Sequence, residues 1–536
     1  MGGPYLGFCG GRVDDEDGAK SLILGPSDIQ EELTPCVSVG QQGRCLSPLG
    51  PTTVGLIYVN PEGPVGSEGD TLASGLDIRN AFSRMGFDDR ESVSLIGGGH
   101  AFGKAHGACP GTEAPCGEGE LQGKGPNTLT SGFEGAWTAT PFTWSNTFFQ
   151  NMFDLTWELG QSPAGNLQWF PAGNNTDDIM MLTSDLALRD DPDYRVISEE
   201  YKNDIASLEA DFAKSWYRLT SADMGPRSRC IGNDVPPAQA FQNSLPEPTA
   251  ASLEVDYDAM YTAISDMISE DKATHIPSFS KLAYQCASTF RETDYQGGCN
   301  GARIRMEPEL TWPGNEGVAD SLAALQPIQD KFPDASMADI IVLAGNVAID
   351  LAAGEEKMLP FCPGRVDAPD GDGSAAYLAP RIYNPMLLTV RDYMQVAGLT
   401  PEEGVAVMAR PGTGDMNISN QFFIDLKANP SEFNPMEQAL LEPEFMDIVT
   451  MYAADNEKFM MNFMKGWTYL MTADRFDGPV KNQCKNVNYW DGDMPSMPGS
   501  TTSEDDGSTS TDSAVSSKLS LSVIAAAFVA AAGLAM

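Results

Sequence analysis

Apolar residues recur along most of this chain at the three-to-four-residue spacing of amphipathic helices, whereas the alternation typical of strands is scarce. We therefore predict an all-α fold. The pattern predicts helices over residues 72–86, 89–105, 144–157, 180–188, 199–220, 257–269, 278–292, 318–332, 337–353 and 456–471.

The chain also repeats itself. FCGGRVD at residues 8–14 returns as FCPGRVD at 361–367, an offset of 353, and FAKSWYRLTSAD at 212–223 returns as FMKGWTYLMTAD at 463–474, an offset of 251. These pairs predict a tandem duplication of one mainly helical unit. The Pro-rich segment 236–251 is the expected linker. It separates a first domain over 1–245 from a second domain over 250–490.

The two copies differ at their beginnings. About a hundred residues precede FCPGRVD in the second copy, and seven precede FCGGRVD in the first. By internal symmetry, the first copy is expected to lack its opening helices. A domain without them would expose a large apolar surface, which favours an incomplete chain.

Charge and cysteine content narrow the class of protein. A net charge of −42 and a pI near 4.2 exclude a nucleic-acid partner, because phosphates would repel this chain. Ten cysteines in 536 residues fix no disulfide framework but are compatible with an oxidising compartment. Asn174 and Asn417 begin glycosylation sequons.

The C-terminus suggests a surface location. Residues 491–518 are rich in Ser, Thr and Asp and predict an unfolded stalk, and residues 519–536 are uncharged. The apolar tail fits a GPI-attachment signal, a tail-anchoring helix or merely an apolar end. The N-terminus shows no signal peptide. Cell-surface or extracellular localisation is therefore expected only if N-terminal sequence is missing.

The candidate chemistry lies in SVSLIGGGHAFGKAHGAC, residues 92–109, which holds two of the chain's 3 histidines. A glycine triplet precedes His100, and close approach of something large and flat would explain it. His100 and His106 point in different directions on a helix, so they do not form an i, i+4 zinc pair. Two alternatives remain: a core histidine, or a zinc cluster with Cys109 and Cys116 at an unusual spacing.

The segment GGGHAFGKAHGA resembles the proximal-histidine helix of the catalase-peroxidases, haem enzymes of the plant, fungal and bacterial peroxidase superfamily. Further collinear matches extend from about residue 7 to residue 477. They include GLIYVNPEGP (55–64), SGFEGAWTATPFTWSNTFFQNMFDLTWEL (131–159), MLTSDLALRDDPDY (181–194) and FAKSWYRLTSADMGPRSR (212–229).

The resemblance implies roles for individual residues. His100 would bind haem iron axially, Asp185 would accept a hydrogen bond from its other nitrogen, and Trp137 would stack beside it. Read without the resemblance, Asp185 is a helix N-cap and Trp137 a core aromatic. The residues expected to contact haem are His100, Gly98, Gly99, Lys104 and Trp137.

Three more residues match the family's catalytic positions. Arg229 matches a mobile arginine tied to catalase turnover, although a surface arginine is equally compatible with the sequence. Tyr58 and Met85 match two members of a covalent Met-Tyr-Trp adduct, and both could equally be core residues.

The chain departs from the family on the distal side. The helix carrying the distal His, Arg and Trp should precede FCGGRVD, and with it the third adduct partner is missing. In the second copy, Tyr284 and Gln285 stand where Trp and His would be. The second domain is therefore expected to be haem-free and to support the first domain or dimer contacts.

The resemblance thus implies a tandem-duplicated haem-peroxidase fold with one haem b per chain, in the first domain. Its activity would be decomposition of hydrogen peroxide and oxidation of small electron donors in the response to oxidative stress, in a homodimer. The alternative is a non-catalytic, surface-displayed module of peroxidase fold that binds a partner.

Overall fold

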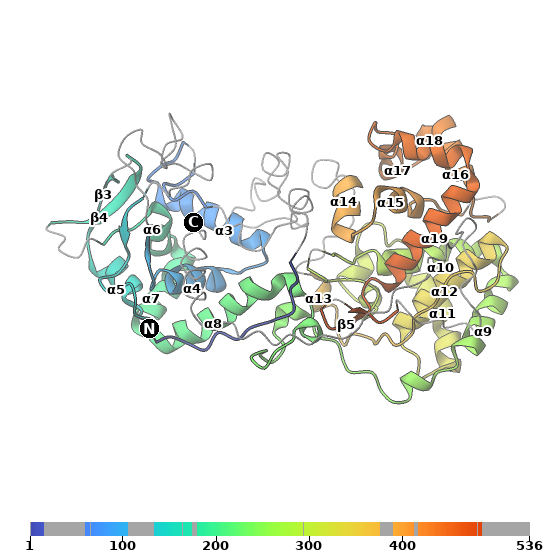
Figure 1. The fold of residues 1–536 in the computed structure, drawn as a ribbon, viewed down its shortest axis with the longest axis horizontal. Coiled ribbons are helices and arrows are strands. Elements are labelled where there is room, and N and C mark those ends of the chain that lie inside the picture. The colour runs from blue at the N-terminus through green and yellow to red at the C-terminus, as the bar shows by residue number, and fades with distance from the viewer. Residues whose placement is uncertain are drawn as a thin grey trace, which may run out of the picture. The chain divides into compact units, whose positions relative to one another are not determined.

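The computed structural model describes residues 2–14, 59–64, 66–105, 133–162, 165–173, 179–292, 294–375, 390–411, 416–479 and 481–484. These residues are mostly helical, and the strands form three short two-stranded antiparallel ladders (Figure 1). The prediction of an all-α fold is confirmed. The predicted stalk (491–518) and apolar tail (519–536) lie outside the described residues. In the described part, none of the helices combines the length and apolar character that a bilayer-spanning segment needs.

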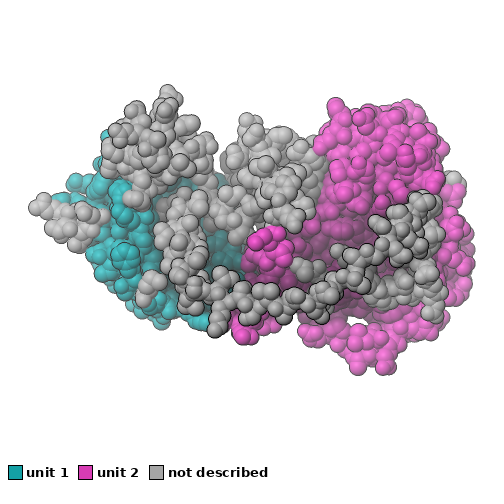
Figure 2. Space-filling view, viewed as in Figure 1, with its two compact units in different colours: residues 1–8, 34–221, 506–536 teal, residues 9–33, 222–505 magenta. Residues whose placement is uncertain are grey.

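The chain divides into two compact units (Figure 2). Of the described residues, 2–8 and 59–221 form the first unit, and 9–14 and 222–484 form the second. Sequence reasoning places the domain boundary between 245 and 250, whereas the compact units meet at 221/222. The Cys9–Cys230 disulfide lies within the second unit. It joins a residue from the beginning of the first repeat to a residue that follows its end.

The first unit surrounds a core of buried aromatic and aliphatic side chains. Its helices and strands are α3 (Thr71–Arg84), α4 (Asp89–Gly99), β1 (Lys104–Ala105), β2 (Gly135–Ala136), α5 (Thr147–Asp154), β3 (Trp157–Gln161), β4 (Leu167–Pro171), α6 (Thr183–Asp190), α7 (Pro192–Asn203) and α8 (Ile205–Ser221).

Two predicted helices in this unit differ most from the observed ones, for local reasons. The helix predicted over 89–105 ends at Gly99, and His100 is its C-cap. The single helix predicted over 199–220 is two helices, because Asp204 adopts an extended conformation and its side chain accepts from Ala206 and Ser207 N–H groups. An N-cap of this kind begins a new helix.

The second unit has its own larger apolar core. At its centre, α12 (Met337–Ala353) is buried on nearly every side and packs against α10 (Lys272–Ala287). The other elements are α9 (Tyr257–Glu270), α11 (Val318–Lys331), α13 (Asp372–Ala375), α14 (Val390–Ala397), α15 (Pro401–Val407), α16 (Gln421–Ala428), α17 (Pro435–Ala439), α18 (Met446–Ala454), α19 (Asn456–Thr472), β5 (Phe476–Asp477) and β6 (Lys481–Asn482). Short 3₁₀ turns lie at Ala222–Met224, Arg227–Arg229, Ala240–Gln242, Ser252–Glu254, Arg303–Arg305, Glu309–Thr311 and Pro430–Glu432.

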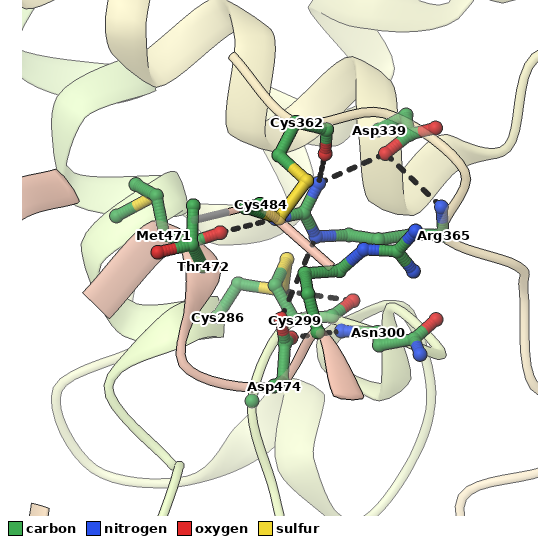
Figure 3. A network of polar contacts seen from close by, with 12 residues as sticks. Cys286, Cys299, Asn300, Asp339, Cys362, Arg365, Met471, Thr472, Asp474 and Cys484 are labelled. Atoms are coloured by element: carbon green, nitrogen blue, oxygen red, sulfur yellow. Dashed lines mark hydrogen bonds and ion pairs between the residues drawn. A yellow bond between two sulfur atoms is a disulfide. The ribbon is translucent and has the colours of Figure 1, made fainter. Parts of the chain in front are cut away.

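The repeat markers form the same contact in both copies. In the second copy, the guanidinium of Arg365 donates to Asp339 Oδ1 (3.0 Å) and to the Cys362 carbonyl (2.7 Å), and its Nε lies 3.9 Å from Asp474 Oδ1 (Figure 3). Cys362 is disulfide-bonded to Cys484.

In the first copy, Arg12 donates to the Cys9 carbonyl (3.0 Å) and to Asp223 (2.5 and 2.7 Å), and Cys9 is disulfide-bonded to Cys230. Each marker arginine therefore joins the FCxGRVD segment to the aspartate that follows the last long helix of its copy. We call this arrangement the repeat clamp.

Candidate functional site

The candidate site begins with His100 at the C-terminal end of α4. A capping box fixes the start of this helix: the Asp88 side chain accepts from the Glu91 N–H, and the Glu91 side chain accepts from Asp88 N–H. The helix buries Val93 and Leu95 in the core of the first unit. His100 itself is buried, with a relative exposure of 9 %. Its position is therefore set by the packing of α4.

Two residues from separate segments meet at the imidazole. Asp185, fully buried near the start of α6, places Oδ1 3.1 Å from His100 Nδ1. The Asp185 Oδ2 atom accepts from the Trp137 indole N–H and from the Leu182 backbone N–H, both at 2.7 Å. The indole of Trp137 stacks on the imidazole, with ring centroids 3.8 Å apart and planes 10° from parallel. The structure therefore brings together His100, Asp185 and Trp137, as the resemblance implies.

Burying a carboxylate without partners costs several kcal/mol, so the two N–H donors are what allows Asp185 to remain in the core. Neither His100 Nδ1 nor Asp185 Oδ1 makes a hydrogen bond of good angle in the described part of the chain, although the two atoms face each other. Within the cluster, His100 Nδ1 and Asp185 Oδ1 are therefore close enough for a hydrogen bond but are not aligned for one.

The glycine triplet has two different environments. A Cβ on Gly97 would lie 2.1 Å from the ring of Phe149, and one on Gly98 would lie 2.2 Å from the ring of Phe212. Among the residues that the structure describes, none would come within 4 Å of a Cβ on Gly99. Helix packing therefore explains Gly97 and Gly98. Only Gly99, next to His100, leaves open space of the kind that a flat cofactor would need.

The other predicted residues of the first unit lie in ordinary surroundings. The Lys104 ammonium, half exposed in β1, pairs with Glu134 at 2.6 Å. Met85 is the C-cap of α3 and packs against the core. Tyr58 lies outside the described residues, as do His106, Cys109 and Cys116 of the zinc alternative. Among the residues that are described, no group of three or more His, Cys, Asp or Glu could hold a metal ion.

Arg229 is buried in the second unit, so the reading of this residue as a surface arginine is wrong. Its guanidinium carbon lies 3.4 Å from the ring centroid of Tyr295 and 4.9 Å from that of Phe476. It also donates to the carbonyls of Met224 (3.0 Å) and Pro479 (2.6 Å). Burial lowers the pKa of Arg229. Sequence reasoning gave no sign of this aromatic surrounding.

Comparison with known proteins decides the family. The sequence matches the family model described as Peroxidase over residues 1–204 and 260–430. It is 36% identical to the catalase-peroxidase of Escherichia coli, over 89% of this chain and 76% of that protein. It is 33% identical to the catalase-peroxidase of Natronomonas pharaonis, over 89% of this chain and 79% of that one. The chain belongs to the catalase-peroxidase family.

Membership of the catalase-peroxidase family makes the chain an oxidoreductase and implies haem as its cofactor. The residues present fit that group. The imidazole of His100 turns Nδ1 toward a buried carboxylate, so Nε2, across the ring, would be the atom that holds the iron. The open side of Gly99 lies beside it. The two Peroxidase matches also confirm the tandem repeat.

One neighbour of His100 was not found from the sequence. The ring of Phe148, fully buried in α5, meets the imidazole edge-to-face with centroids 5.3 Å apart. The only local signal is the aromatic pair Phe148-Phe149 in a predicted helix, a pattern that indicates core packing.

In the second unit, Gln285 donates to the Gly314 carbonyl at 3.2 Å and thus has a structural partner.

Proposed function

We propose that this chain binds one haem b in the first unit through His100 and uses it to decompose hydrogen peroxide and to oxidise small electron donors. The observation that carries the proposal is the buried His100–Asp185–Trp137 cluster. When bound, haem supplies the redox chemistry that reduces peroxide.

The protein's own residues tune that chemistry. Asp185 Oδ1 lies 3.1 Å from Nδ1 of His100 and is placed to accept the hydrogen of that nitrogen, which would select the tautomer whose Nε2 binds metal. The negative charge of Asp185 would also make the imidazole a stronger electron donor. The stacked indole of Trp137 fixes the plane of the imidazole. The indole N–H also anchors Asp185, so the three side chains act as one unit.

The test is to add haemin to purified protein and to measure the Soret absorption and the oxygen released from peroxide. His100→Leu should abolish both. His275→Leu is the matched control, because His275 lies on α10 of the second unit and stacks only on Phe279 among its described ring contacts. Oxygen release that is insensitive to His100→Leu would refute the proposal. Haem binding without peroxide consumption or donor oxidation would favour the binding-module alternative.

A role in an oxidising, extracytoplasmic setting is part of the proposal. All six described cysteines are paired, as Cys9–Cys230, Cys286–Cys299 and Cys362–Cys484. Disulfides persist in secretory and extracellular compartments and are rare in reducing ones. Surface attachment through residues 519–536, the homodimer and the role in oxidative stress remain predictions. Release of the protein from intact cells by a phosphatidylinositol-specific phospholipase would test the first.

A further inference from the structure

Helix α7 carries two fully buried tyrosines that differ in one respect. The hydroxyl of Tyr201 donates to Asp211 Oδ2 on α8, at 2.9 Å. The hydroxyl of Tyr194, two turns earlier, has no hydrogen-bond partner among the residues that the structure describes. Of this pair, only Tyr201 has a carboxylate in place to take its phenolic proton.

Tyr201 is also connected to the candidate site by aromatic rings in edge-to-face contact. The centroid distances are 5.3 Å from His100 to Phe148, 5.1 Å from Phe148 to Phe149, and 5.5 Å from Phe149 to Tyr201. All fall in the range of favourable aromatic pairs. Both phenylalanines are completely buried, so water does not interrupt the series.

The charges around Tyr201 determine how it can be oxidised. Arg90 lies over the ring, 5.3 Å from its centroid, and donates to the same Asp211 oxygen at 2.6 Å. A hydrogen bond with Glu200 is the main cause that raises the pKa of Arg90, so this side chain stays cationic. Burial, followed by the charge of Asp211, raises the pKa of Tyr201, so the phenol is neutral before oxidation.

A cation beside the ring disfavours a positively charged phenol radical. Loss of an electron must therefore be accompanied by loss of the proton, and Asp211 is the acceptor within hydrogen-bond distance. The Asp211 side chain is 19% exposed and that of Arg90 is 40% exposed, so this end of the aromatic series reaches solvent.

We propose that Tyr201 is a redox-active residue that carries oxidising equivalents from the haem site toward the surface; this inference rests on the proposed function. Reduction of one peroxide to two waters takes two electrons and two protons. Tyr201 supplies one of these electrons, a small electron donor supplies the other, and both protons come from solvent. The Tyr201 O–H bond breaks, its proton passes to Asp211, and a neutral tyrosyl radical remains. An external one-electron donor restores the phenol, and the proton returns from Asp211.

The test is electron paramagnetic resonance of haem-loaded protein, frozen within milliseconds to seconds of peroxide addition. The wild type should give a tyrosyl signal whose hyperfine structure narrows when ring-deuterated tyrosine is incorporated. Tyr201→Phe should abolish that signal, and Tyr194→Phe should keep it. Each variant removes one buried phenolic hydroxyl from the same helix, so the size of the change is matched. Asp211→Asn should lower the radical yield several-fold, because an amide cannot accept the proton.

The outcomes separate the two proposals. A protein that consumes peroxide but forms no tyrosyl radical, or whose signal survives Tyr201→Phe, overturns this inference and leaves the proposed function intact. If Tyr201→Phe fails to fold, an undiminished signal in Asp211→Asn overturns it instead. A wild type that neither binds haem nor consumes peroxide overturns both.

Discussion

Replacing Gly98 or Gly99 with alanine adds the same methyl group to the same turn of α4, yet the two changes should have different effects. A Cβ on Gly98 would lie 2.2 Å from one carbon of the Phe212 ring and 2.7 Å from two more. A Cβ on Gly99 would meet no atom of the described part of the chain within 4 Å. The pair therefore separates a glycine required by packing from one that leaves open space.

The magnitudes follow from two opposing terms. Alanine is favoured over glycine in a helix by about 1 kcal/mol. Overpacking a close-packed core costs about 1–3 kcal/mol. The Phe212 ring has little room to move, since it contacts Trp144 and Trp216 at centroid distances of 4.9 and 5.8 Å. We therefore expect Gly98→Ala to lower the free energy of unfolding by up to about 2 kcal/mol. Gly99→Ala, with no clash, should leave it unchanged or raise it by up to about 1 kcal/mol.

Two measurements on the same variants check this reasoning. Urea unfolding of haem-free protein, followed by tryptophan fluorescence, reports mainly the first unit, which holds five of the seven described tryptophans. Haemin titration reports cofactor affinity. Gly99→Ala should weaken haemin binding while the urea midpoint holds, because the added methyl occupies the open side next to His100. A Gly99→Ala variant as unstable as Gly98→Ala would refute the packing argument. Unchanged haemin affinity in Gly99→Ala would show that haem does not lie against this residue.

Three further predictions concern the second unit and the repeat clamp. Arg365→Ala should cost about 3–5 kcal/mol of unfolding free energy, because it leaves the buried Asp339 carboxylate without its cation. Arg12→Ala should cost at most about 1 kcal/mol, because the side chains of its ion pair are 36% and 26% exposed. Urea unfolding of the two variants compares these costs. Burial raises the pKa of Asp350 to about 7, so folding favours its protonated form. The stability that this group contributes should be lost as the pH rises from about 4 to 7. Asp350→Asn should remove that part of the pH dependence of the unfolding free energy in urea, and an unchanged pH dependence would contradict the prediction. Replacing both cysteines of Cys362–Cys484, which are 122 residues apart, should lower the unfolding free energy by roughly 4–5 kcal/mol. Replacing both cysteines of Cys286–Cys299, which are 13 residues apart, should lower it by roughly 3 kcal/mol, because the loop that this disulfide closes is shorter. Thermal unfolding measures the order of the two effects, and the reverse order would contradict the loop-length argument.

Much of the fold could be predicted because its signals are local. The helix over 337–353 coincides with α12, since a long apolar run with Ser336 as N-cap and Gly354 as C-cap marks both ends. The helix predicted from residue 278 begins instead at Lys272, because the Asp271 side chain caps it and Pro277 is accommodated inside. Proline is a poor guide to a boundary when a stronger cap precedes it.

The candidate site could be predicted in its members but not in its surroundings. His100, Trp137 and Asp185 each belong to a recognisable motif, so the resemblance alone was enough to group them. The contact between Gly98 and Phe212 joins residues more than a hundred positions apart, and no local pattern announces it. The same holds for the series from Phe148 to Tyr201, which depends on how α5 and α7 pack.

The repeat clamp shows that a sequence marker can be repeated without the chemistry of the candidate site. The marker arginine joins its segment to the following aspartate in both copies, but Arg365 is fully buried between two carboxylates while Arg12 is partly exposed. The second copy holds no histidine that corresponds to His100, since its only histidine, His275, lies outside the motif. The repeated marker is therefore explained by packing and cross-linking alone. It carries no information about where peroxide reacts, which we propose to be at His100, in a segment that the second copy does not repeat.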